Sequence, residues 1–416
     1  MTLSSSYGGR DASALGALTA MSETRRAAII LDALSRGALP GLGDPAQRAA
    51  AVDPGVVREP PLAGPLADPC AERHQVQVGD DESRLDVFLT GTVFMDVIFT
   101  GMPGPPVPGT EILTSGLGSA PGGVANLAVA LSRLGLRVGL AAAFGDDMFG
   151  SYLWRTLAEQ EGIDLSASRQ LPGWPTPVTI SLSDGSDRSL VTYSEPPPFD
   201  PDQMVTAVPP ASTCFSWVTR PAPEWVTQLR ASGATVFADV GWDPSGTWSP
   251  AVLDRLAAVD VFMPNAIEAM SYTRTSSPEA ALDALAPRVP VCVIKAGGAG
   301  ALGLDNRAGE RASAPAVPVG VLDPTGAGDV FDAGFIFGTL AGWPLEQRLK
   351  FANLCAGLSV RHHSGSLGAP CWGEIADWGE NPDVPPEVLA QYAFVVPYIP
   401  DAAADTVIRA RPTVRD

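Results

Sequence analysis

From Leu85 onward, short apolar runs alternate with amphipathic stretches of helical spacing, and no other feature of the chain constrains its fold as strongly. A short apolar run bounded by turn residues is typical of a strand that is buried on both faces. The amphipathic stretch after it is typical of a helix that covers one face of a sheet. Repetition of this pair predicts βαβ units, a mostly parallel sheet and an α/β fold.

The predicted strands share short runs of apolar residues, and the predicted helices share apolar positions three and four residues apart. The strands are Asp86–Gly91, Arg137–Phe144, Thr213–Val218, Thr235–Asp239, Val259–Met263, Val289–Lys295 and Val317–Leu322. The helices are Asn126–Leu134, Phe149–Glu161, Glu224–Ala231, Pro250–Ala257, Pro278–Leu285, Asp329–Leu340 and Leu345–Val360.

One segment departs from this rhythm. Thr176–Ser183 and Arg188–Ser194 alternate apolar and polar residues, and Asp184–Asp187 between them is a turn signal, so the segment predicts a β-hairpin. Together with the Gly- and Pro-rich stretch Phe99–Leu117, it predicts a small β-sheet that covers the main domain. Such a lid excludes water from a reactive site. The lid segments are expected at about 94–119 and 176–195.

A chain of 416 residues suits one large domain with extensions. We expect this domain at residues 85–378, an Ala/Gly/Pro-rich N-terminal extension of unknown role at 1–84 and a C-terminal tail at 379–416. The helical stretch Glu23–Ser35 would fit a degenerate helix-turn-helix, but no second patterned helix follows it.

The formal net charge of −19 disfavours a nucleic-acid partner and an anionic membrane surface, because both are bound mainly by clustered Lys and Arg. No apolar run approaches the ~20 residues that cross a bilayer, and the first thirty residues lack the order of a signal peptide. The five cysteines show no C-x-x-C spacing. We therefore expect a cytoplasmic protein with buried thiols.

The most informative motif is Asp323-Pro324-Thr325-Gly326-Ala327-Gly328-Asp329, which follows an apolar run and opens an apolar helix. Glycines at such a turn leave backbone N–H groups uncovered, and the helix N-terminus adds partial positive charge, so the turn suits an anion such as phosphate. An acidic residue in a first helical turn is often only a favourable dipole partner. Asp329, however, directly follows Gly-Ala-Gly, so its carboxylate would lie beside a bound phosphate and could accept the proton of an attacking hydroxyl.

This motif closely resembles the second signature of the ribokinase-like, PfkB-type carbohydrate kinases, and the resemblance extends over about residues 85–378. It implies a Rossmann-like three-layer α/β/α fold with a small β-sheet lid, and ATP-dependent phosphorylation of a hydroxyl on a small sugar. By position, it implies that Asp329 is the catalytic base and that Gly326, Ala327 and Gly328 supply the amides of an anion hole.

Two further segments resemble the family's sugar-binding elements. Ala120–Asn126 resembles the first signature, whose diglycine and Asn contact the sugar, although the spacing is one residue tighter than in ribokinase. Asp96 follows the first strand, where family members carry an Asp that hydrogen-bonds sugar hydroxyls. The resemblance implies these substrate-binding residues: Asp96, Gly122, Gly123 and Asn126.

The nucleotide side is expected around Asn265-Ala266-Ile267-Glu268, which resembles the family's Asn-x-x-Glu element that organises Mg²⁺ and the phosphates. Alone, this pattern is typical of a capped helix start. Glu268 would hold Mg²⁺ through water, since Mg²⁺ prefers oxygen ligands and keeps several waters. Asp323 and Thr325 match positions that bind a monovalent cation such as K⁺ in some members. The cofactor-binding residues are expected to be Asn265, Glu268, Lys295, Gly298, Gly300 and Asn353.

Gly298–Gly303 also satisfies G-x-G-x-x-G, but no helix follows it, so a dinucleotide site is not expected. The middle-strand element Asp239–Asp243 lacks the Asn and Arg that many relatives carry, which favours an uncharged substrate. A nucleoside kinase of the pseudouridine or adenosine type fits the same motifs, and so does a sugar-sensing regulator with little turnover. We expect a sugar or nucleoside as the partner, no nucleic acid or membrane, and a homodimer through the lid.

Overall fold

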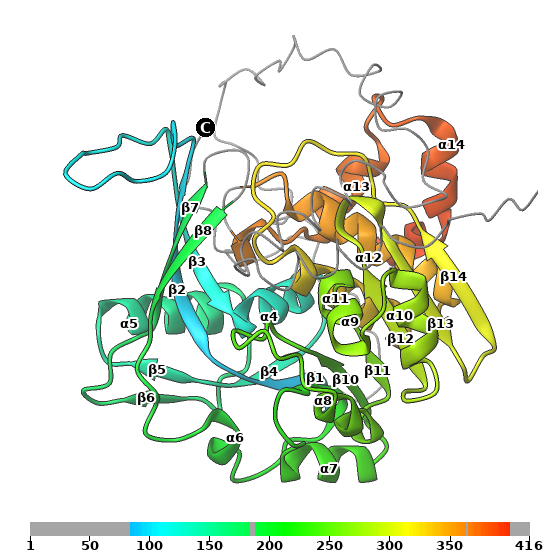
Figure 1. Cartoon of the computed structure of the whole chain (residues 1–416), viewed down its shortest axis with the longest axis horizontal. Coiled ribbons are helices and arrows are strands. Elements are labelled where there is room, and N and C mark those ends of the chain that lie inside the picture. The colour runs from blue at the N-terminus through cyan, green and yellow to red at the C-terminus, as the bar shows by residue number, and fades with distance from the viewer. Residues whose placement is uncertain (1–83, 184–187, 363–364, 400–416) are drawn as a thin grey trace, which may run out of the picture. The chain divides into compact units, whose positions relative to one another are not determined.

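The main sheet of the computed structural model has eight strands in the order β14-β13-β12-β11-β10-β9-β1-β4 (Figure 1). The strands from β12 to β4 in this order pair in parallel, and the hairpin β13–β14 adds two antiparallel strands at one edge. Their bounds are β1 Leu85–Thr90, β4 Val138–Ala141, β9 Ala211–Trp217, β10 Thr235–Asp239, β11 Val261–Phe262, β12 Val291–Lys295, β13 Ala301–Asp305 and β14 Glu310–Ala314.

The structure describes residues 84–183, 188–362 and 365–399. The expected N-terminal extension, apart from Arg84, and the expected turn at 184–187 lie outside them. The described residues divide into the short turn Asp243–Trp248 and a unit that holds all the others. Within the turn, the Asp243 carboxylate accepts hydrogen bonds from the backbone N–H groups of Ser245 and Trp248.

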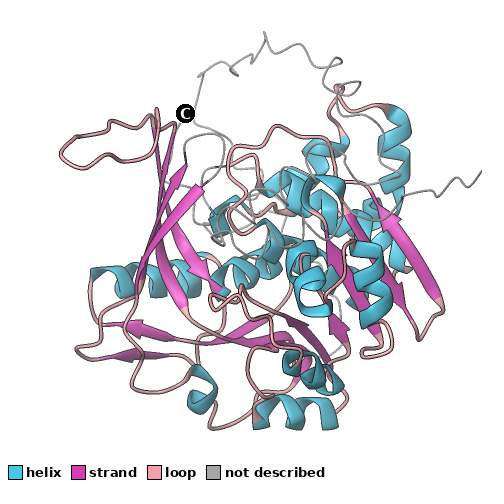
Figure 2. Cartoon of the chain, viewed as in Figure 1, coloured by secondary structure: helices cyan, strands magenta, loops and turns pink. Residues whose placement is uncertain are grey.

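Seven of the described helices fall where the amphipathic stretches predict them, and two of these seven end in short π or 3₁₀ turns. Four more helices, α6, α9, α13 and α14, were not predicted (Figure 2). The larger unit contains α4 Val124–Arg133, α5 Met148–Arg155 with a π turn Thr156–Gln160, α6 Pro201–Met204, α7 Glu224–Ala231, α8 Ala251–Asp254 with a 3₁₀ turn Arg255–Ala258, α9 Ala266–Thr273, α10 Pro278–Leu285, α11 Ala327–Leu340, α12 Leu345–Ser359, α13 Trp372–Gly379 and α14 Pro386–Leu389.

Different helices cover the two faces of the sheet. Successive side chains of a strand point to opposite faces. In β1, Val87 and Leu89 belong to the apolar cluster that also contains α4, α11 and α12, whereas Phe88 packs with Trp225 and Leu229 of α7. The unit therefore has three layers, α/β/α, and the predicted fold class is confirmed.

Helix α11 passes through the core. Residues Val330–Gly338 along it are buried, as expected for a helix that is apolar on all sides. Its neighbour α12 approaches closely, because a Cβ atom on Gly334 would lie only 2.9 Å from the Ala352 Cα. The N-terminus of α11, which carries the Gly-Ala-Gly-Asp motif, is therefore fixed by packing along most of the helix.

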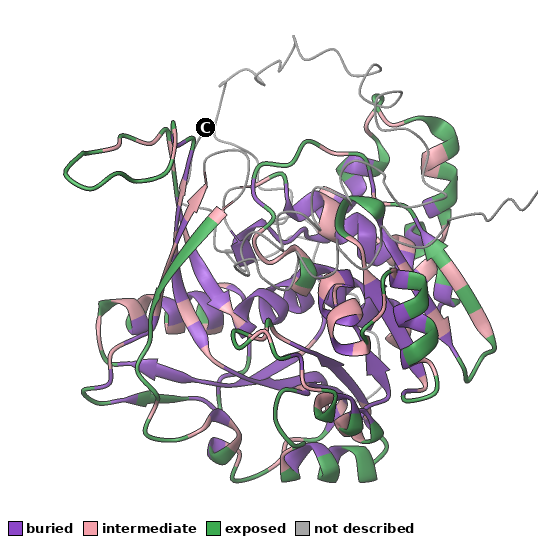
Figure 3. Cartoon of the chain, in the orientation of Figure 1, coloured by how far each residue is buried: buried purple, intermediate pink, exposed green. Residues whose placement is uncertain are grey.

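A second, four-stranded sheet forms the lid, in the order β3-β2-β7-β8. Its strands are β2 Val93–Thr100, β3 Gly116–Gly123, β7 Val178–Ser183 and β8 Arg188–Tyr193. The predicted hairpin is confirmed, since β7 and β8 pair antiparallel, and β7 joins β2 in parallel. The Gly- and Pro-rich residues 101–115 form the loop between β2 and β3, which projects from the unit in Figure 1. Figure 3 shows β8 largely exposed and the parallel strands of the main sheet buried.

Two strand predictions need correction. Val317–Leu322 is not a strand, because Pro315 and Pro318 lack N–H donors and Val317 packs under Gly357 of α12. The hairpin β13–β14 occupies the sheet edge instead. The predicted strand Arg137–Phe144 is two strands, since β4 pairs with β1 whereas β5 (Ala143–Gly145) pairs with β6 (Arg169–Leu171).

Part of the expected C-terminal tail packs on the larger unit. Beyond α14, the 3₁₀ helix Ala390–Tyr398 buries Tyr392 and Val395. The rings of Phe394 and Tyr398 meet Trp343 edge-on, with centroids 4.9 and 5.0 Å away. Residues 386–399 are therefore bound to the main domain by aromatic contacts.

Three cysteines, Cys214, Cys292 and Cys355, are buried free thiols, as expected. Burial raises the pKa of the Cys214 thiol to about 12, so this thiol stays protonated and unreactive. Cys371 is disulfide-bonded, so the expectation of buried thiols throughout is wrong for this residue. Among the described helices, none has the length and apolarity needed to cross a bilayer.

Candidate active site

The turn before α11 is built as the motif predicts. Gly326 has φ 76°, a left-handed conformation that favours glycine, and a Cβ atom there would also come 3.1 Å from the Asn126 side chain. The first N–H groups of a helix have no carbonyl partner within it, so they point out of its N-terminus. The Ala327 N–H is an exception, since it donates to the Pro324 carbonyl at 3.2 Å. The turn and the helix end thus form a small site of positive potential.

Asp329 lies in the first turn of α11 and is close to Asn126 of α4. The Asn126 Nδ2 atom donates to Asp329 Oδ2 at 3.3 Å. Burial raises the pKa of the Asp329 carboxyl to about 6, against the opposing effect of the Lys295 ammonium. The other amide atom, Asn126 Oδ1, is buried and has no hydrogen-bond partner among the described residues. It is therefore available to accept a hydrogen bond from a ligand.

A cluster of buried charges lies behind the helix N-terminus. The Lys295 Nζ atom is 2.8 Å from Asp239 Oδ2 and 3.0 Å from Asp332 Oδ1. Burial alone would lower the pKa of Lys295, but the Asp239 and Asp332 carboxylates hold it above its usual value. The ammonium also lies near Gly328, since a Cβ atom there would be 3.7 Å away. Lys295, predicted to contact the nucleotide, is therefore engaged by two carboxylates.

The sequence analysis did not select Asp332, although its spacing from Asp329 could have indicated it. It follows Asp329 by three residues on one helix, which places both on the same face. Burial raises the pKa of Asp332 well above its usual value, with Lys295 acting in the opposite direction.

Asn265 and Glu268 form a capping box at the start of α9. The Glu268 N–H donates to Asn265 Oδ1 at 2.9 Å, and the Asn265 N–H donates to Glu268 Oε2 at 3.1 Å. The Asn-x-x-Glu pattern therefore does cap the start of α9. Burial and the Asp239 carboxylate raise the pKa of Glu268 to about 8, so the carboxylate lies in an environment that favours an added cation.

On the lid side, Asp96 of β2 lies against Gly122 of β3. A Cβ atom on Gly122 would come 2.0 Å from Asp96 Oδ2, so only glycine leaves room for this carboxylate. Gly123 has φ 64° and ends β3 directly before α4. Burial, together with the charges of Asp323 and Asp329, raises the pKa of Asp96 to about 7. The structure thus brings Asp96 and Gly122 near the predicted base.

Asp323 and Thr325 form a tight local turn that meets the lid. The Asp323 Oδ1 atom accepts hydrogen bonds from the Thr325 N–H at 3.0 Å and its hydroxyl at 2.6 Å. Arg188 of β8 donates to Thr325 Oγ1 at 3.1 Å and lies 3.9 Å from Asp323 Oδ1. The Asp323 Oδ2 atom is buried without a hydrogen-bond partner in the described parts of the chain. The place of Arg188 here was not predicted.

The remaining residues predicted for the nucleotide lie near the end of β14. Gly298 is in the 3₁₀ turn Gly297–Ala299, and a Cβ atom there would meet open space. Gly300 has φ 92° and lies against Ala314, whose carbonyl oxygen would be 2.1 Å from a Cβ atom on Gly300. Asn353 Nδ2 donates to the carbonyls of Ala314 and Pro315, at 3.0 Å each. Its amide nitrogen is therefore used to hold this loop.

A cavity of about 660 Å³ opens at Asp329. From the predicted site it includes Gly123, Asn126 and Asp329. Its other walls come from Phe94 of β2, from Trp217 at the carboxyl end of β9 and from Arg220 in the following loop. Ligands of open α/β sheets bind at this end of the strands.

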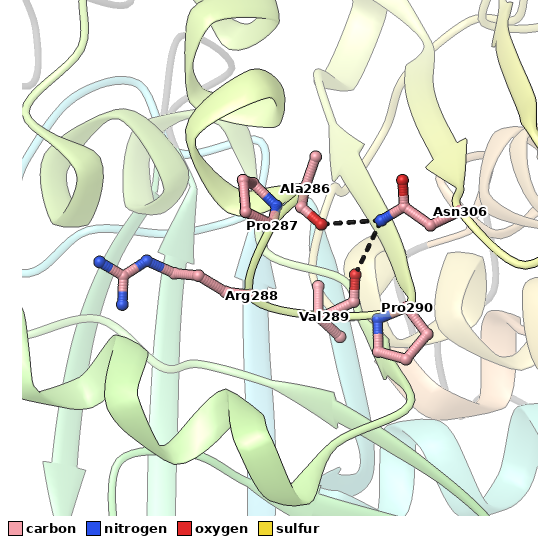
Figure 4. A pocket seen from close by; sticks show the side chains of 6 residues that line it. All are labelled: Ala286, Pro287, Arg288, Val289, Pro290 and Asn306. Atoms are coloured by element: carbon pink, nitrogen blue, oxygen red, sulfur yellow. Dashed lines mark hydrogen bonds between the residues drawn. The ribbon is translucent and has the colours of Figure 1, made fainter.

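A second hollow, of about 480 Å³, is lined by residues 286–290 and Asn306 (Figure 4). Asn306 Nδ2 donates to the carbonyls of Ala286 and Val289, which simply closes the turn there. Its lining contains no carboxylate, thiol or imidazole, so the cavity at Asp329 is the candidate site.

Sequence comparison relates the chain to carbohydrate kinases. Residues 86–203 and 221–371 match the model of the pfkB family carbohydrate kinase. A 5-dehydro-2-deoxygluconokinase of Geobacillus kaustophilus is 25% identical over 326 residues, which cover 72% of this chain and 95% of that protein. A nucleoside kinase of Methanothermobacter thermautotrophicus is 29% identical over 279 residues, which cover 63% and 87% of the two chains.

Solved structures share the fold. A putative ribokinase from Agrobacterium tumefaciens superposes with a TM-score of 0.60 at 22% identity, covering 72% of this chain and 99% of its own. A putative Ribokinase II from E. coli, in complex with ATP and Mg²⁺, gives a TM-score of 0.59 at 21% identity and covers 71% and 99%.

Proposed function

The chain belongs to the pfkB family of carbohydrate kinases, and from this premise we propose that it transfers the γ-phosphoryl group of ATP to a hydroxyl of a small, uncharged sugar, with Asp329 as general base. The observation that carries the proposal is the position of Asp329, which lies in the first turn of α11 after Gly-Ala-Gly, lines a cavity and contacts Asn126. A carboxylate beside an anion site is placed to take a proton from a hydroxyl that attacks a phosphoryl group.

The chemistry divides between the base and the helix N-terminus. Asp329, with a pKa raised by burial to about 6, is mostly ionised at pH 7 and is a stronger base than an exposed Asp. Asn126 Nδ2 orients the carboxylate, while Asn126 Oδ1 can accept from a neighbouring substrate hydroxyl. The amides of Gly326 and Gly328 at the end of α11 would stabilise negative charge on the transferring group, whereas the Ala327 N–H donates to the Pro324 carbonyl.

ATP and Mg²⁺ are the co-substrate and metal that we propose, in keeping with the similar E. coli structure that contains both. The buried carboxylates of Asp239, Glu268 and Asp332 exceed the single ammonium of Lys295, which fits an additional cation nearby. Glu268 would hold this ion through water, since Mg²⁺ prefers oxygen ligands and keeps several waters. Mg²⁺ would neutralise charge on the phosphates.

A monovalent cation such as K⁺ is proposed at Asp323 and Thr325. The buried, unpartnered Asp323 Oδ2 atom supports this proposal, because an isolated carboxylate oxygen in the interior is costly. Arg188 already supplies one positive charge to this turn from the lid. A smaller response to K⁺ is therefore expected than at a turn without such an arginine.

The proposal of an uncharged substrate rests on how the nearby arginines are used. The strand and loop segments 93–100 and 119–126 contain no Lys or Arg. Arg220 lines the cavity but pairs with Asp200 and Asp202, and Arg188 bonds to Thr325. A phosphorylated sugar would need a cationic partner for its second anion.

A coupled assay of ADP release over neutral sugars, nucleosides and sugar monophosphates tests this function. We expect a neutral compound to exceed its monophosphate by at least ~10-fold in kcat/KM, which is about 1.4 kcal/mol in transition-state binding. Fructose 6-phosphate or tagatose 6-phosphate as the best substrate would contradict it. Absence of turnover with the whole panel would favour the sugar-sensing regulator instead.

A homodimer through the lid is also proposed. The edge strand β8 of the lid exposes Leu190, Val191 and Tyr193, and apolar side chains close together on an exposed strand favour an interface. Sedimentation of the wild type and of Leu190→Glu would test it, because a charge in such an interface should shift the protein to monomer.

A further inference from the structure

The lid hairpin β7–β8 is joined to the rest of the unit by two chain crossings. Residues 172–177 lead from β6 into β7, and residues 194–197 lead out of β8. Pro196 and Pro197 of the second crossing line the cavity at Asp329, and β7 pairs with β2, which carries Asp96. The way in which the two crossings are held therefore determines where the lid places Asp96 and part of the cavity wall.

Asp147 holds the first crossing through Thr176. The Asp147 Oδ2 atom accepts a hydrogen bond from the Thr176 N–H at 2.8 Å, and its Oδ1 atom accepts one from the Thr176 hydroxyl at 2.7 Å. The hydroxyl oxygen of Thr176 also accepts from the Gly145 N–H at 3.2 Å. Thr176 is only 2% exposed, so its N–H and hydroxyl would be buried without a partner if these bonds were lost.

The turn that carries Asp147 is closely packed. Asp147 caps α5, since its Oδ1 atom also accepts from the Gly150 N–H at 2.8 Å. A Cβ atom on Gly145 would lie 2.7 Å from the Trp174 carbonyl oxygen, and one on Gly150 would lie 2.1 Å from the Gly145 carbonyl oxygen. Burial would raise the pKa of Asp147, but hydrogen bonds from Gly150 and Thr176 hold it below its usual value. The carboxylate that holds Thr176 is therefore ionised and fixed in place.

Trp174 ties the second crossing to the first. Its Nε1 atom donates to the Glu195 carbonyl at 3.3 Å, directly before the prolines that line the cavity. The Trp174 side chain is buried in a cluster with Ala143, Leu171 and Met204. Both ends of the hairpin β7–β8 are therefore attached to the same short segment.

From Thr176 the connection continues to the substrate side of the lid. The carbonyl of the next residue, Pro177, accepts from the Met95 N–H at 2.8 Å, and Met95 precedes Asp96 in β2. The ring of Pro177 fixes its φ angle, so a displaced Thr176 would displace this contact as well. Among the described residues that line the cavity, neither Asp147 nor Thr176 occurs. Any effect of these two residues on a substrate must therefore act through the lid.

We propose that Asp147 and Thr176 are positioning residues that fix the hairpin β7–β8, so that the lid holds Asp96 where a substrate hydroxyl can reach it. The proposal rests on the proposed function in one respect, the role of Asp96 in binding the substrate. It goes further in assigning control of substrate affinity to two residues outside the cavity. ATP affinity is not affected, since the residues expected to bind the nucleotide lie outside the lid.

The test measures the KM of the substrate and the KM of ATP separately in full-length Thr176→Val, with D-ribose, D-fructose and uridine as the probes. Val keeps the shape of Thr but lacks the hydroxyl that joins Asp147 to Gly145. We expect the KM of each probe that is turned over to rise by ~10-fold, while the KM of ATP changes by less than ~2-fold. Thr176→Ser retains the hydroxyl and should keep both KM values near those of the wild type.

Thr213→Val is the matched control. Thr213 of β9 is also 2% exposed, and its hydroxyl donates to the Asp86 carbonyl at 2.8 Å within the main sheet. This variant loses the same buried group, so its thermal stability should fall by a similar amount while both KM values stay unchanged. An unchanged probe KM in Thr176→Val, or an equal rise in the KM of ATP, would overturn the proposal and leave the kinase function intact. A rise as large in Thr213→Val would overturn it as well.

If none of the probes is turned over, hydrogen exchange of the protein without substrate tests the positioning role independently of the kinase function. The amides of β2 and β7 should exchange about 5-fold faster in Thr176→Val than in the wild type, with β10 and β12 unchanged. This result would support the proposal although the kinase assignment has failed. Equal exchange of the lid strands in the variant and the wild type would overturn it.

Discussion

At the scale of single residues, the base assignment has the sharpest test. Replacing Asp329 by Asn keeps the hydrogen-bonding shape beside Asn126 but removes the proton acceptor. We expect the variant to lose at least ~10²-fold in kcat, with its thermal stability and ATP affinity preserved. Steady-state kinetics with ATP and the best substrate provide the measurement. Near-wild-type turnover in the purified variant would show that another group accepts the proton.

The environment of Asp329 also predicts a pH profile. Burial raises the pKa of its carboxyl to about 6, and only the ionised form can accept a proton. The kcat/KM should therefore fall as the pH decreases through about 6 and should level off above it. Lys295 lowers this pKa, so Lys295→Met should move the acidic limb to higher pH. A limb that stays in place in the variant would contradict the electrostatic role of the ammonium.

Glu268 is expected to act on the metal. Glu268→Gln preserves the capping box, since Gln can also accept from the Asn265 N–H, but it cannot ionise when a cation binds nearby. We expect a higher Mg²⁺ concentration at half-maximal activity, with sugar binding unchanged. Titration of Mg²⁺ in the kinetic assay measures this shift. Full activity of the wild type in excess chelator would contradict the metal role altogether.

The sequence predicted some of these residues better than others. Asp329 and Asn126 stand in distinctive motifs, and the structure brings them within hydrogen-bond distance of each other. Lys295 was placed near the site but assigned to the nucleotide, because sequence alone does not show that Asp239 and Asp332 converge on it from β10 and α11. Such convergence depends on how strands and helices are ordered in space, which no local spacing records.

At the scale of elements, the lid contacts the turn at Asp323 and Thr325 through the side chain of Arg188. Arg188 extends from β8 to Thr325 and lies near Asp323. Arg188→Ala should lower kcat/KM by about 10-fold, the size expected for a lost charge-assisted contact, and should increase the stimulation by K⁺. Activity measured with and without KCl at constant ionic strength provides the test. Equal K⁺ responses of the variant and the wild type would contradict the idea that K⁺ can replace the Arg188 guanidinium at this turn.

The elements themselves show where pattern reading succeeds. Helices α7 and α10 were predicted to the residue, because their amphipathic runs are bounded by Pro or Ser at the start. The segment Val317–Leu322 was predicted as a strand from its apolar residues alone. Its prolines cannot donate to a neighbouring strand, and Val317 packs against α12. The apolar residues of this segment therefore contribute to packing and not to a sheet.

At the scale of the whole described unit, the C-terminal segment contributes to stability. Trp372 is fully buried and lies against Phe351 and Phe337, whereas Phe394 is more exposed and meets Trp343. Trp372→Ala should reduce the free energy of unfolding by about 3–5 kcal/mol, the usual cost of removing a large buried ring. Phe394→Ala should cost less.

Urea unfolding of the two variants and the wild type measures these free energies. Equal stabilities of Phe394→Ala and the wild type would show that residues beyond α13 pack elsewhere in solution. This contribution was invisible in the sequence, because a Pro-rich, irregular segment carries no helical or strand period.

The residues of the candidate site lie far apart in the chain, and this separation affects when activity appears during folding. Asn126 and Asp329 are 203 residues apart in the chain, and Arg188 is 137 residues from Thr325. Contacts across such separations form slowly, because a long loop must close before they contribute any stability. Helices will therefore recover early during refolding, while turnover will return only when α11 reaches the sheet. Turnover should then return later than the helical signal during refolding, and a growing chain on the ribosome should stay inactive at least until α11 has emerged.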